Sequence, residues 1–198
     1  MKFMNANSET PFSLSLLRKS RPVSQGPRLR LELLSERHLT LRYVDWLNDP
    51  EVCQFNRHGS GYTLEKAKSY YDSVRDSTDT VVFAICLKES GEHLGNISLN
   101  DIDWAQKSSE ISILIGEKKH WGKGFGDEAI RLMIDFALKT LKLKRVWIGM
   151  TVNNTGMIRI AEKMGFQHER ILKKAFKKNG QEWDVTEWGL RNPEEERS

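Results

Sequence analysis

The 198-residue sequence has few of the residues that cross-link or interrupt a chain, with only two cysteines and five prolines. Cys53 and Cys86 form no CxxC pair and no metal-ligand spacing, so we expect neither a disulfide framework nor a metal site. The longest apolar run, Val81 to Leu87, has seven residues, far fewer than the roughly 20 that span a bilayer. Cys86 lies in this run, and we expect it to be a buried thiol. These shortages argue against a secreted miniprotein and a membrane protein, and they favour a cytoplasmic location.

The sequence also has little excess of either charge, with 31 basic and 27 acidic residues and a net charge of +4. Residues 1–27 carry four basic side chains and one acidic side chain, which leaves only +1 for the remaining 171 residues. A nucleic-acid-binding domain normally concentrates positive charge on its folded surface. We therefore expect no nucleic-acid partner. Binding through the basic arm stays an alternative, which a steep salt dependence that is lost on deleting residues 1–27 would support.

The hydrophobic fraction of 38% and the charged fraction of 29% are those of a globular protein, and the length suits one domain. We divide the chain into a flexible basic arm (1–27), one folded domain (28–190) and a polar tail (191–198). The arm lacks the apolar core of a secretory signal. Its basic, serine-containing, acid-poor composition leaves an organelle transit peptide open as an alternative.

Periodicity and turn residues predict the order of the elements along the chain. Strands are expected at 29–33, 80–87, 94–99, 109–115, 146–152, 166–176 and 183–190. Helices are expected from Ser35 to Leu47 and over 64–74, 127–141 and 155–164. The last two strands flank Asn179-Gly180, a strong hairpin signal. This order is typical of a mixed α/β or α+β single domain rather than a doubly wound sheet.

The sharpest local motif is Trp121-Gly-Lys-Gly-Phe-Gly-Asp-Glu128, placed between a strand and a long helix. Glycines at 122, 124 and 126 allow a close backbone approach, and the helix adds its positive end, so the turn suits a phosphate or pyrophosphate. The spacing is neither GxxxxGK[ST] nor GxGxxG, which disfavours a P-loop and a dinucleotide site. Taken alone, the motif is also compatible with a tight connecting loop.

A second motif follows the next strand. Asn153-Asn154 opens a helix that ends in Glu162-Lys-Met-Gly-Phe166. An asparagine in this place either caps the helix or binds a ligand between the two strand ends. The residues alone leave both interpretations open.

In this order, the two motifs resemble the GNAT superfamily of acetyl-CoA-dependent N-acetyltransferases. The early segment Trp46-Leu-Asn-Asp-Pro-Glu-Val52, together with Asp184 in the last strand, is similar to the RimJ/RimL-like branch of that superfamily. The resemblance covers residues 28–190. It implies an α+β fold with a mixed, mostly antiparallel central sheet flanked by helices. It also implies acetyl-CoA as co-substrate, with no metal.

The resemblance further implies which residues hold acetyl-CoA. Backbone groups of Ile113, Leu114 and Ile115 would pair with the pantetheine arm, where a splay from strand 146–152 admits it. Asn154 would contact the pantetheine or the acetyl end. The residues expected to wrap the pyrophosphate are Trp121, Gly122, Lys123, Gly124, Phe125, Gly126 and Asp127.

For the chemistry, the resemblance points to Glu110 as the base that takes a proton from the attacking amine; the alternative is a surface glutamate at a strand end. Many family members carry a tyrosine acid and a serine where this chain has Ala161 and Met157, so no general acid is assigned. The residues expected around the acceptor are Trp46, Tyr62, Asp101 and Trp104, and His58 and His120 are further candidate proton carriers.

We therefore expect direct transfer of an acetyl group to a primary amine in a ternary complex, with a small amine or an amino sugar as the acceptor. Two alternatives stay open: a non-catalytic acyl-CoA-binding sensor or interaction module, and an acetyltransferase of protein N-termini. The exposed final hairpin makes a homodimer possible.

Overall fold

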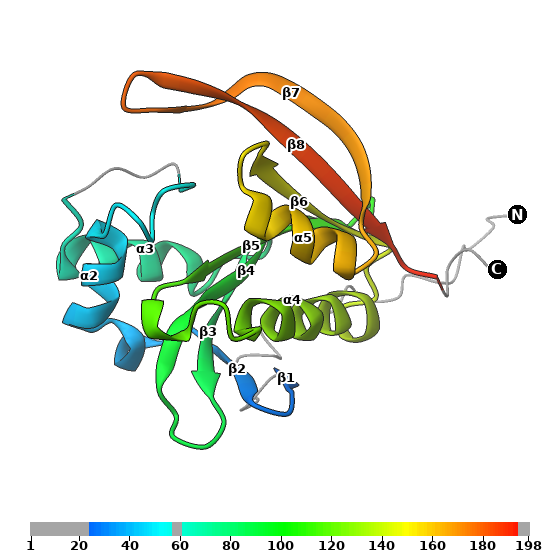
Figure 1. The fold of residues 1–198 in the computed structure, drawn as a ribbon. Helices are drawn as coiled ribbons and strands as arrows, with labels where there is room; N and C mark the ends of the chain where they lie inside the picture. Colours follow the sequence, from blue (N-terminus) through cyan, green and yellow to red (C-terminus); the bar gives the residue numbers. More distant parts are fainter. Residues whose placement is uncertain (1–23, 57–60, 194–198) are drawn as a thin grey trace, which may run out of the picture.

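The computed structural model describes residues 24–56 and 61–193 (Figure 1). The predicted flexibility of the arm concerns mainly residues 1–23, which lie outside this part, as does His58. The described residues include positions on either side of the predicted domain of residues 28–190. The first of them form a short strand at Ser24–Gln25, and at the other end the Asn192 amide donates to the carbonyl of Lys144 (2.8 Å).

One eight-stranded sheet runs through the molecule in the order β1-β2-β3-β4-β5-β6-β8-β7. Within the described residues β5 and β6 are the one parallel pair, and every other neighbouring pair is antiparallel, which confirms the predicted α+β class. The strands are β1 (Ser24–Gln25), β2 (Leu29–Leu33), β3 (Val81–Leu87), β4 (His93–Asp103), β5 (Ser108–Ile115), β6 (Arg145–Thr151), β7 (Gln167–Lys178) and β8 (Gln181–Arg191).

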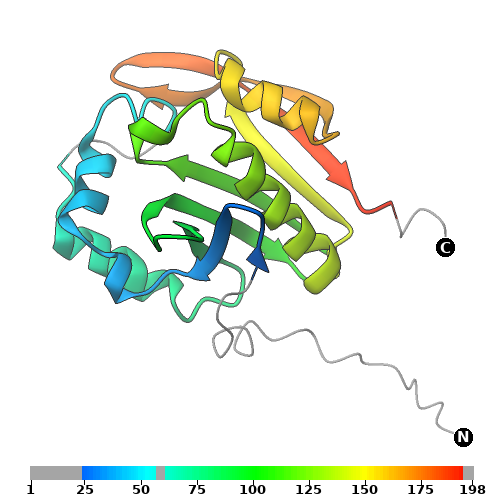
Figure 2. The same ribbon diagram turned by 60° about the horizontal axis from the view of Figure 1, so that its bottom comes forward.

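The helices are η1 (Glu36–His38), α2 (Leu41–Asn48), α3 (Leu64–Val74), η2 (Lys118–His120), α4 (Phe125–Asp135), the π-helical continuation η3 (Phe136–Thr140) and α5 (Thr155–Lys163). Helices α4 and α5 lie across one face of the sheet (Figure 2). Helices α2 and α3 share a hydrophobic cluster that Leu114 near the end of β5 contacts. Among the described residues, no helix has the length and apolar character needed to cross a membrane.

The predicted single helix from Ser35 to Leu47 is wrong, because the chain makes two separate helical segments there. Helix η1 ends at His38, and the Thr40 side chain then accepts a hydrogen bond from the Tyr43 amide (3.2 Å) to cap α2. A hydroxyl cap of this kind favours a new helix start over a continuous helix.

The core lies between the sheet and α4. Strand β3 is buried along almost its whole length, and Phe83 packs edge to face on Phe136 with ring centroids 5.1 Å apart. Ile130 and Met133 of α4 are fully buried in the same cluster. Cys86 belongs to β3 and is 2% exposed, which confirms the predicted buried thiol.

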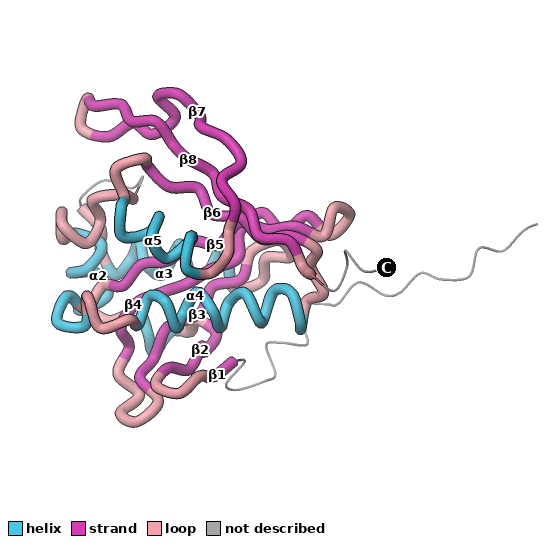
Figure 3. Tube along the Cα trace, turned by 45° about the vertical axis from the view of Figure 1, so that its right-hand side comes forward, coloured by secondary structure: helices cyan, strands magenta, loops and turns pink. Residues whose placement is uncertain are grey.

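The final hairpin turns at Asn179 and Gly180, which both have positive φ (50° and 74°), as a two-residue turn of this kind requires. Strand β8 inserts next to β6, and β7 becomes the outer strand of the sheet. The hairpin projects beyond the helices (Figure 3). Pairing of two copies through this edge stays a prediction.

Candidate active site

The central strands separate halfway along their length. Strands β5 and β6 pair only from Ser108 to Glu110 and from Arg145 to Trp147. Beyond these residues the two strands are no longer paired, and a cleft of about 990 Å³ lies at the opening. The cleft is lined by residues of β4, β5, β6, β8 and the segment after α2 (residues 49–56). The fold therefore exposes a strand edge in the middle of its own sheet.

The register of β4 and β5 decides which backbone groups of β5 face this opening. Gly116 donates its amide to the carbonyl of Leu94 in β4 (2.9 Å). Alternate residues of an antiparallel strand bond the same neighbour, so Leu114 directs its amide and carbonyl toward β4, while Ile113 and Ile115 direct theirs to the open edge. This corrects the prediction that Leu114 offers its backbone to a ligand there.

The carbonyl of Ile115 already has a donor. The Trp121 indole Nε1 donates to it (2.8 Å), so Trp121 fixes the end of β5 against the turn that follows. The amide and carbonyl of Ile113 and the amide of Ile115 are thus the groups that β5 can offer along the cleft.

The glycine turn has the backbone that its sequence predicts. Gly122 and Gly124 have φ of +71° and +77°, a region that residues with a side chain avoid. Helix α4 begins immediately after Gly124, so the first amides of the helix, at residues 125–127, have no acceptor within it. Gly126 instead faces α5, where a Cβ would lie 3.3 Å from Ile160. The turn presents amides and a helix N-terminus, a combination that suits an anion.

The side chains of the turn take different roles. Lys123 is exposed, whereas the Phe125 ring is buried under the guanidinium of Arg28, 4.4 Å from its centroid. Asp127 forms an ion pair with Lys163 of α5. Phe125 and Asp127 can therefore serve a ligand through their backbone amides, while their side chains hold the helix in place.

Arg28, the residue immediately before β2, holds this turn in place. Its guanidinium donates to the carbonyls of Lys123 (2.8 Å) and Gly124 (3.1 Å) and to the carboxylate of Glu128 (2.8 Å). The Glu128 carboxylate also accepts the amides of Arg28 and Leu29, both at 2.8 Å. Sequence reasoning missed this clamp, because nothing local links residue 28 to residue 128.

We expect Glu128→Gln to destabilise the fold by about 2 kcal/mol at pH 7, since a glutamine cannot accept from every donor around this nearly buried group. Burial alone would raise the pKa of Glu128, but hydrogen bonds from Arg28 and Leu29 outweigh it and hold the pKa below 4.5. The stabilisation is therefore complete above pH 4.5 and is lost as the pH falls through the lower folded-state pKa. Urea unfolding at several pH values measures the difference.

Asp135→Asn provides the matched control, because Asp135 pairs with Lys139 on the exposed surface of the helix. We expect this change to cost little at any pH. A difference between wild type and Glu128→Gln that stays constant from pH 7 to well below pH 4.5 would contradict the assigned role.

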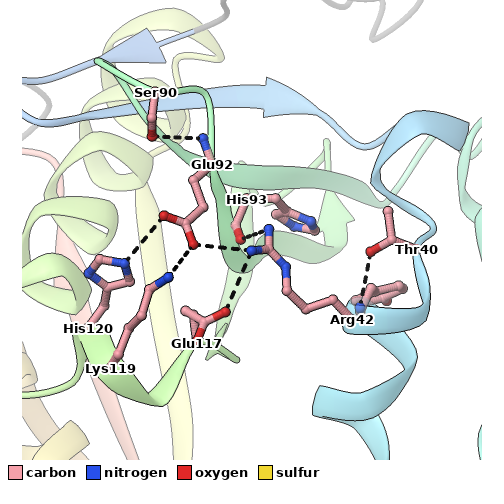
Figure 4. A network of polar contacts seen from close by, with 9 residues as sticks. Thr40, Arg42, Ser90, Glu92, His93, Glu117, Lys119 and His120 are labelled. Atoms are coloured by element: carbon pink, nitrogen blue, oxygen red, sulfur yellow. Dashed lines mark hydrogen bonds and ion pairs between the residues drawn. The ribbon is translucent and has the colours of Figure 1, made fainter.

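The entry to the turn is held by a second polar network (Figure 4). Glu92, in the β3–β4 connection, bonds Lys119 (2.7 Å) and Arg42 (3.1 Å) and lies 3.7 Å from His120. The hydrogen bond from Lys119 lowers the pKa of Glu92. His120, a predicted proton carrier, faces Glu92 and packs edge to face on Phe125, with 5.3 Å between the ring centroids. It does not line the cleft.

Asn154 caps α5. Its side-chain Oδ1 accepts a hydrogen bond from the Met157 amide (3.2 Å). The sequence left open whether this asparagine caps the helix, and the structure shows that it does. Asn154 also lines the cleft. Ala161, where a family tyrosine is expected, is fully buried, so this part of α5 offers no hydroxyl.

Two glutamates, one on each neighbouring strand of β6, lie near Gly149 on the cleft side of the sheet. A Cβ on Gly149 would lie 3.3 Å from Glu110 Oε1, so the Glu110 side chain reaches across to β6. Gly149 is also the register partner of Glu187 in β8, which is 6% exposed and pairs with Arg170 (2.5 Å). Both glutamates line the cleft. Glu187 was missed, although an acid at an inward position of an alternating apolar strand is a usable signal.

The four predicted acceptor residues divide into two pairs. Tyr62 and Asp101 line the cleft. Trp46 does not, because it is 6% exposed and packed so closely under Gly116 that a Cβ there would lie 2.1 Å from its ring. Trp104 also lies outside the cleft lining and donates to the Thr78 carbonyl (2.8 Å). Neither tryptophan therefore lines the cleft in which we place the acceptor.

One group of potential metal ligands lies elsewhere in the described residues. Glu32, His38 and Cys86 bring their donor atoms within 4.8 Å of one another. The Glu32 carboxylate already pairs with the guanidinium groups of Arg30 and Arg37. This arrangement is that of a buried ion-pair network.

Comparison with known proteins agrees with this geometry. Residues 28–167 match the Acetyltransferase (GNAT) domain family. The chain is 28% identical over 172 residues to the uncharacterized N-acetyltransferase p20 of Bacillus licheniformis, covering 81% of this chain and 96% of that protein. It is 26% identical over 151 residues to a spermidine N(1)-acetyltransferase of Vibrio cholerae, covering 73% and 83%.

The fold comparison points the same way. A crystal structure of spermidine N-acetyltransferase from Vibrio cholerae, in complex with CoA and spermine, superposes with a TM-score of 0.77 at 21% identity, covering 84% of this chain and 96% of that one. The family match spans well over half of the sequence and includes both the glycine turn and the separated strands. The chain belongs to the GNAT family of acetyltransferases, enzymes that take their acetyl group from acetyl-CoA.

Proposed function

We propose that this enzyme acetylates the primary amine of a small molecule by direct attack on acetyl-CoA in a ternary complex. The observation that carries the proposal is the cleft at the separation of β5 and β6, which joins the open strand edge to a region whose charged lining residues are all acidic. Those residues are Glu51, Asp101, Glu110 and Glu187; Glu51 also pairs with Lys118 (3.0 Å) and Glu187 with Arg170 (2.5 Å). An acidic lining attracts a cationic amine, and a relative and a structural neighbour from Vibrio cholerae both bear the name of a spermidine acetyltransferase.

The described residues fit acetyl-CoA at three points. Ile113 offers a strand edge to the amides of the pantetheine arm, as in β-strand addition. The turn with Gly122 and Gly124 lets the pyrophosphate approach the first amides of α4. Asn154, at the start of α5, can donate to the ligand from the other side of the opening. The bound co-substrate supplies an acyl thioester.

The reaction needs a neutral amine and a place for its proton. The amine nitrogen bonds to the acyl carbon, the carbon–sulfur bond breaks, and CoA leaves as a thiolate. We assign the proton to Glu110, and the position of its carboxylate near Gly149 in the cleft supports this role. A thiol with a pKa near 8.5 is a good leaving group as its thiolate and needs no strong general acid. The reaction therefore tolerates alanine at position 161, where many family members carry a tyrosine acid.

Calorimetric titration with acetyl-CoA, followed by thiol release with a panel of amines, tests this proposal. We expect micromolar binding and amine-dependent release of free CoA. Binding without release for every amine tested would instead favour an acyl-CoA-binding module. Absence of binding by folded protein would overturn the proposal.

A further inference from the structure

A second cavity of about 390 Å³ adjoins the acidic cleft. It lies between the segment after α2 and the tip of the β7–β8 hairpin, which extends over that segment in Figure 1. Lys178, near the tip, donates to the carbonyls of Cys53 (2.6 Å) and Asn56 (2.9 Å), so the two walls are bonded together. The two cavities share Leu47, Gln54, Phe55, Thr151 and Phe176. The second cavity is therefore a side pocket of the cleft.

Thr151 stands at the junction of the two cavities. It is 3% exposed, and its hydroxyl has no hydrogen-bond partner among the described residues. A buried hydroxyl without a partner carries a desolvation cost. Because Thr151 lines both cavities, a ligand that extends from the cleft into the side pocket can supply the missing partner.

The charges in the side pocket are already neutralised. Asp49 pairs with Lys118 (2.7 Å) and accepts the Glu51 amide (2.9 Å). Lys178 is held by the two carbonyls of the opposite wall. A second ammonium group on the acceptor would lie near the Lys178 ammonium, which repels it. In the part of the lining that the structure describes, it would find no carboxylate other than the ion-paired Asp49. The side pocket thus differs from the cleft, whose charged lining residues are all acidic and include Asp101 and Glu110 beside the ion-paired Glu51 and Glu187.

The rest of the lining is aromatic and neutral polar. Phe55, Phe176 and Trp183 contribute rings, and Asn153 and Gln181 contribute amides. Apolar faces combined with a few hydrogen-bonding groups are typical of sites for compact neutral ligands. Rings that carry several hydroxyls satisfy both parts of such a lining, since their C–H faces pack on aromatic rings while the hydroxyls bond the amides.

We propose that the side pocket holds a neutral, hydroxyl-bearing ring of the acceptor, so that the acceptor is a monoamine of the amino-sugar class rather than a linear polyamine. This inference rests on the proposed acetyl transfer. The amine faces Glu110 in the cleft, and the ring passes Thr151 into the side pocket.

The test compares glucosamine, spermidine and butylamine in the thiol-release assay, with wild type and Thr151→Val. We expect kcat/KM for glucosamine to exceed that for spermidine by at least about tenfold. Thr151→Val, which keeps the side-chain shape, should lower the glucosamine-to-butylamine ratio by about tenfold. Thr186→Val is the matched control: Thr186 is equally buried, bonds Trp188 (3.0 Å) and lines neither cavity, so the ratio should not change.

Titration of the protein, saturated with CoA, with glucosamine and with spermidine separates this inference from the proposed function. Binding of glucosamine that weakens in Thr151→Val supports the side pocket even if no amine releases thiol, an outcome that would overturn only acetyl transfer. Turnover of spermidine in preference to glucosamine would leave acetyl transfer intact and overturn the inference. Equal losses for all amines in Thr151→Val would overturn it as well.

Discussion

Replacing Glu110 with glutamine is expected to lower kcat for amine acetylation by roughly 10²- to 10⁴-fold, the usual contribution of a positioned base. Glutamine keeps the size of the side chain and its place over Gly149 but cannot accept a proton. Acetyl-CoA binding should stay near the wild-type value, because the glycine turn lies outside this change. Thiol-release kinetics and calorimetry measure the two quantities separately.

Two further variants sharpen this experiment. Glu110→Asp keeps a carboxylate on a shorter stem and should recover part of the lost rate. Glu162→Gln changes an exposed glutamate of α5 that does not line the cleft, so it should react at the wild-type rate. If Glu110→Gln retains a kcat within threefold of wild type, Glu110 is not the base. Glu187, which faces the same Gly149 from β8, would then be the next carboxylate to replace.

Replacing Gly122 with valine is expected to weaken acetyl-CoA binding at least 100-fold. Gly122 has φ of +71° with open space around it, so a Cβ there would stand on the surface that the pyrophosphate must approach. Gly124 is a poorer choice, because its carbonyl is bonded by Arg28 and a Cβ there would already contact Arg28 Nη2 at 3.5 Å, so the larger valine side chain would bear on the clamp as well. Calorimetric titration gives the change in affinity.

Gly165→Val is the matched control for that measurement. Gly165 ends α5 with φ of +84°, and a Cβ at this position would also have no described atom within 4 Å beyond its chain neighbours. Both substitutions force a branched residue into the left-handed region, at a cost of roughly 1–2 kcal/mol of stability each. Only the change at Gly122 should affect acetyl-CoA. Comparable affinity losses in both variants would show that backbone strain, rather than a lost anion site, is responsible.

The Arg28 clamp and the polar network of Glu92 explain how the glycine turn keeps a defined backbone conformation although its sequence is rich in glycine. Arg28 holds the carbonyls of Lys123 and Gly124 from one side, and Glu92 holds the preceding turn through Lys119. Amides that are fixed before a ligand arrives lose less entropy on binding. The N-terminal strand is thus part of the support for the site.

Local sequence signals predicted those features that depend on a few neighbouring residues. The glycines at 122 and 124, helix α3 over 64–74 with its Thr63 cap, and the Asn179-Gly180 turn agree with the motifs and ranges read from the sequence. Each reflects a backbone preference or a cap that acts within one turn. The order of these features was enough to indicate the family. The helix expected from Ser35 failed for the same local reason, since Thr40 provides a competing cap.

The sequence by itself therefore determined the fold class, the glycine turn and Glu110 as a candidate base. Only the tertiary structure decided that Trp46 belongs to the core, that Arg28 clamps the turn, and that the side pocket opens at Thr151. Trp46 packs under Gly116 and Arg28 meets Glu128 of α4, while the side pocket depends on the antiparallel pairing of β6 with β8 and on a hairpin tip that packs against the segment after α2. Residues that meet in this way are separated by up to 125 positions. Hydrophobic periodicity reports which face of an element is buried, but not which distant element covers it.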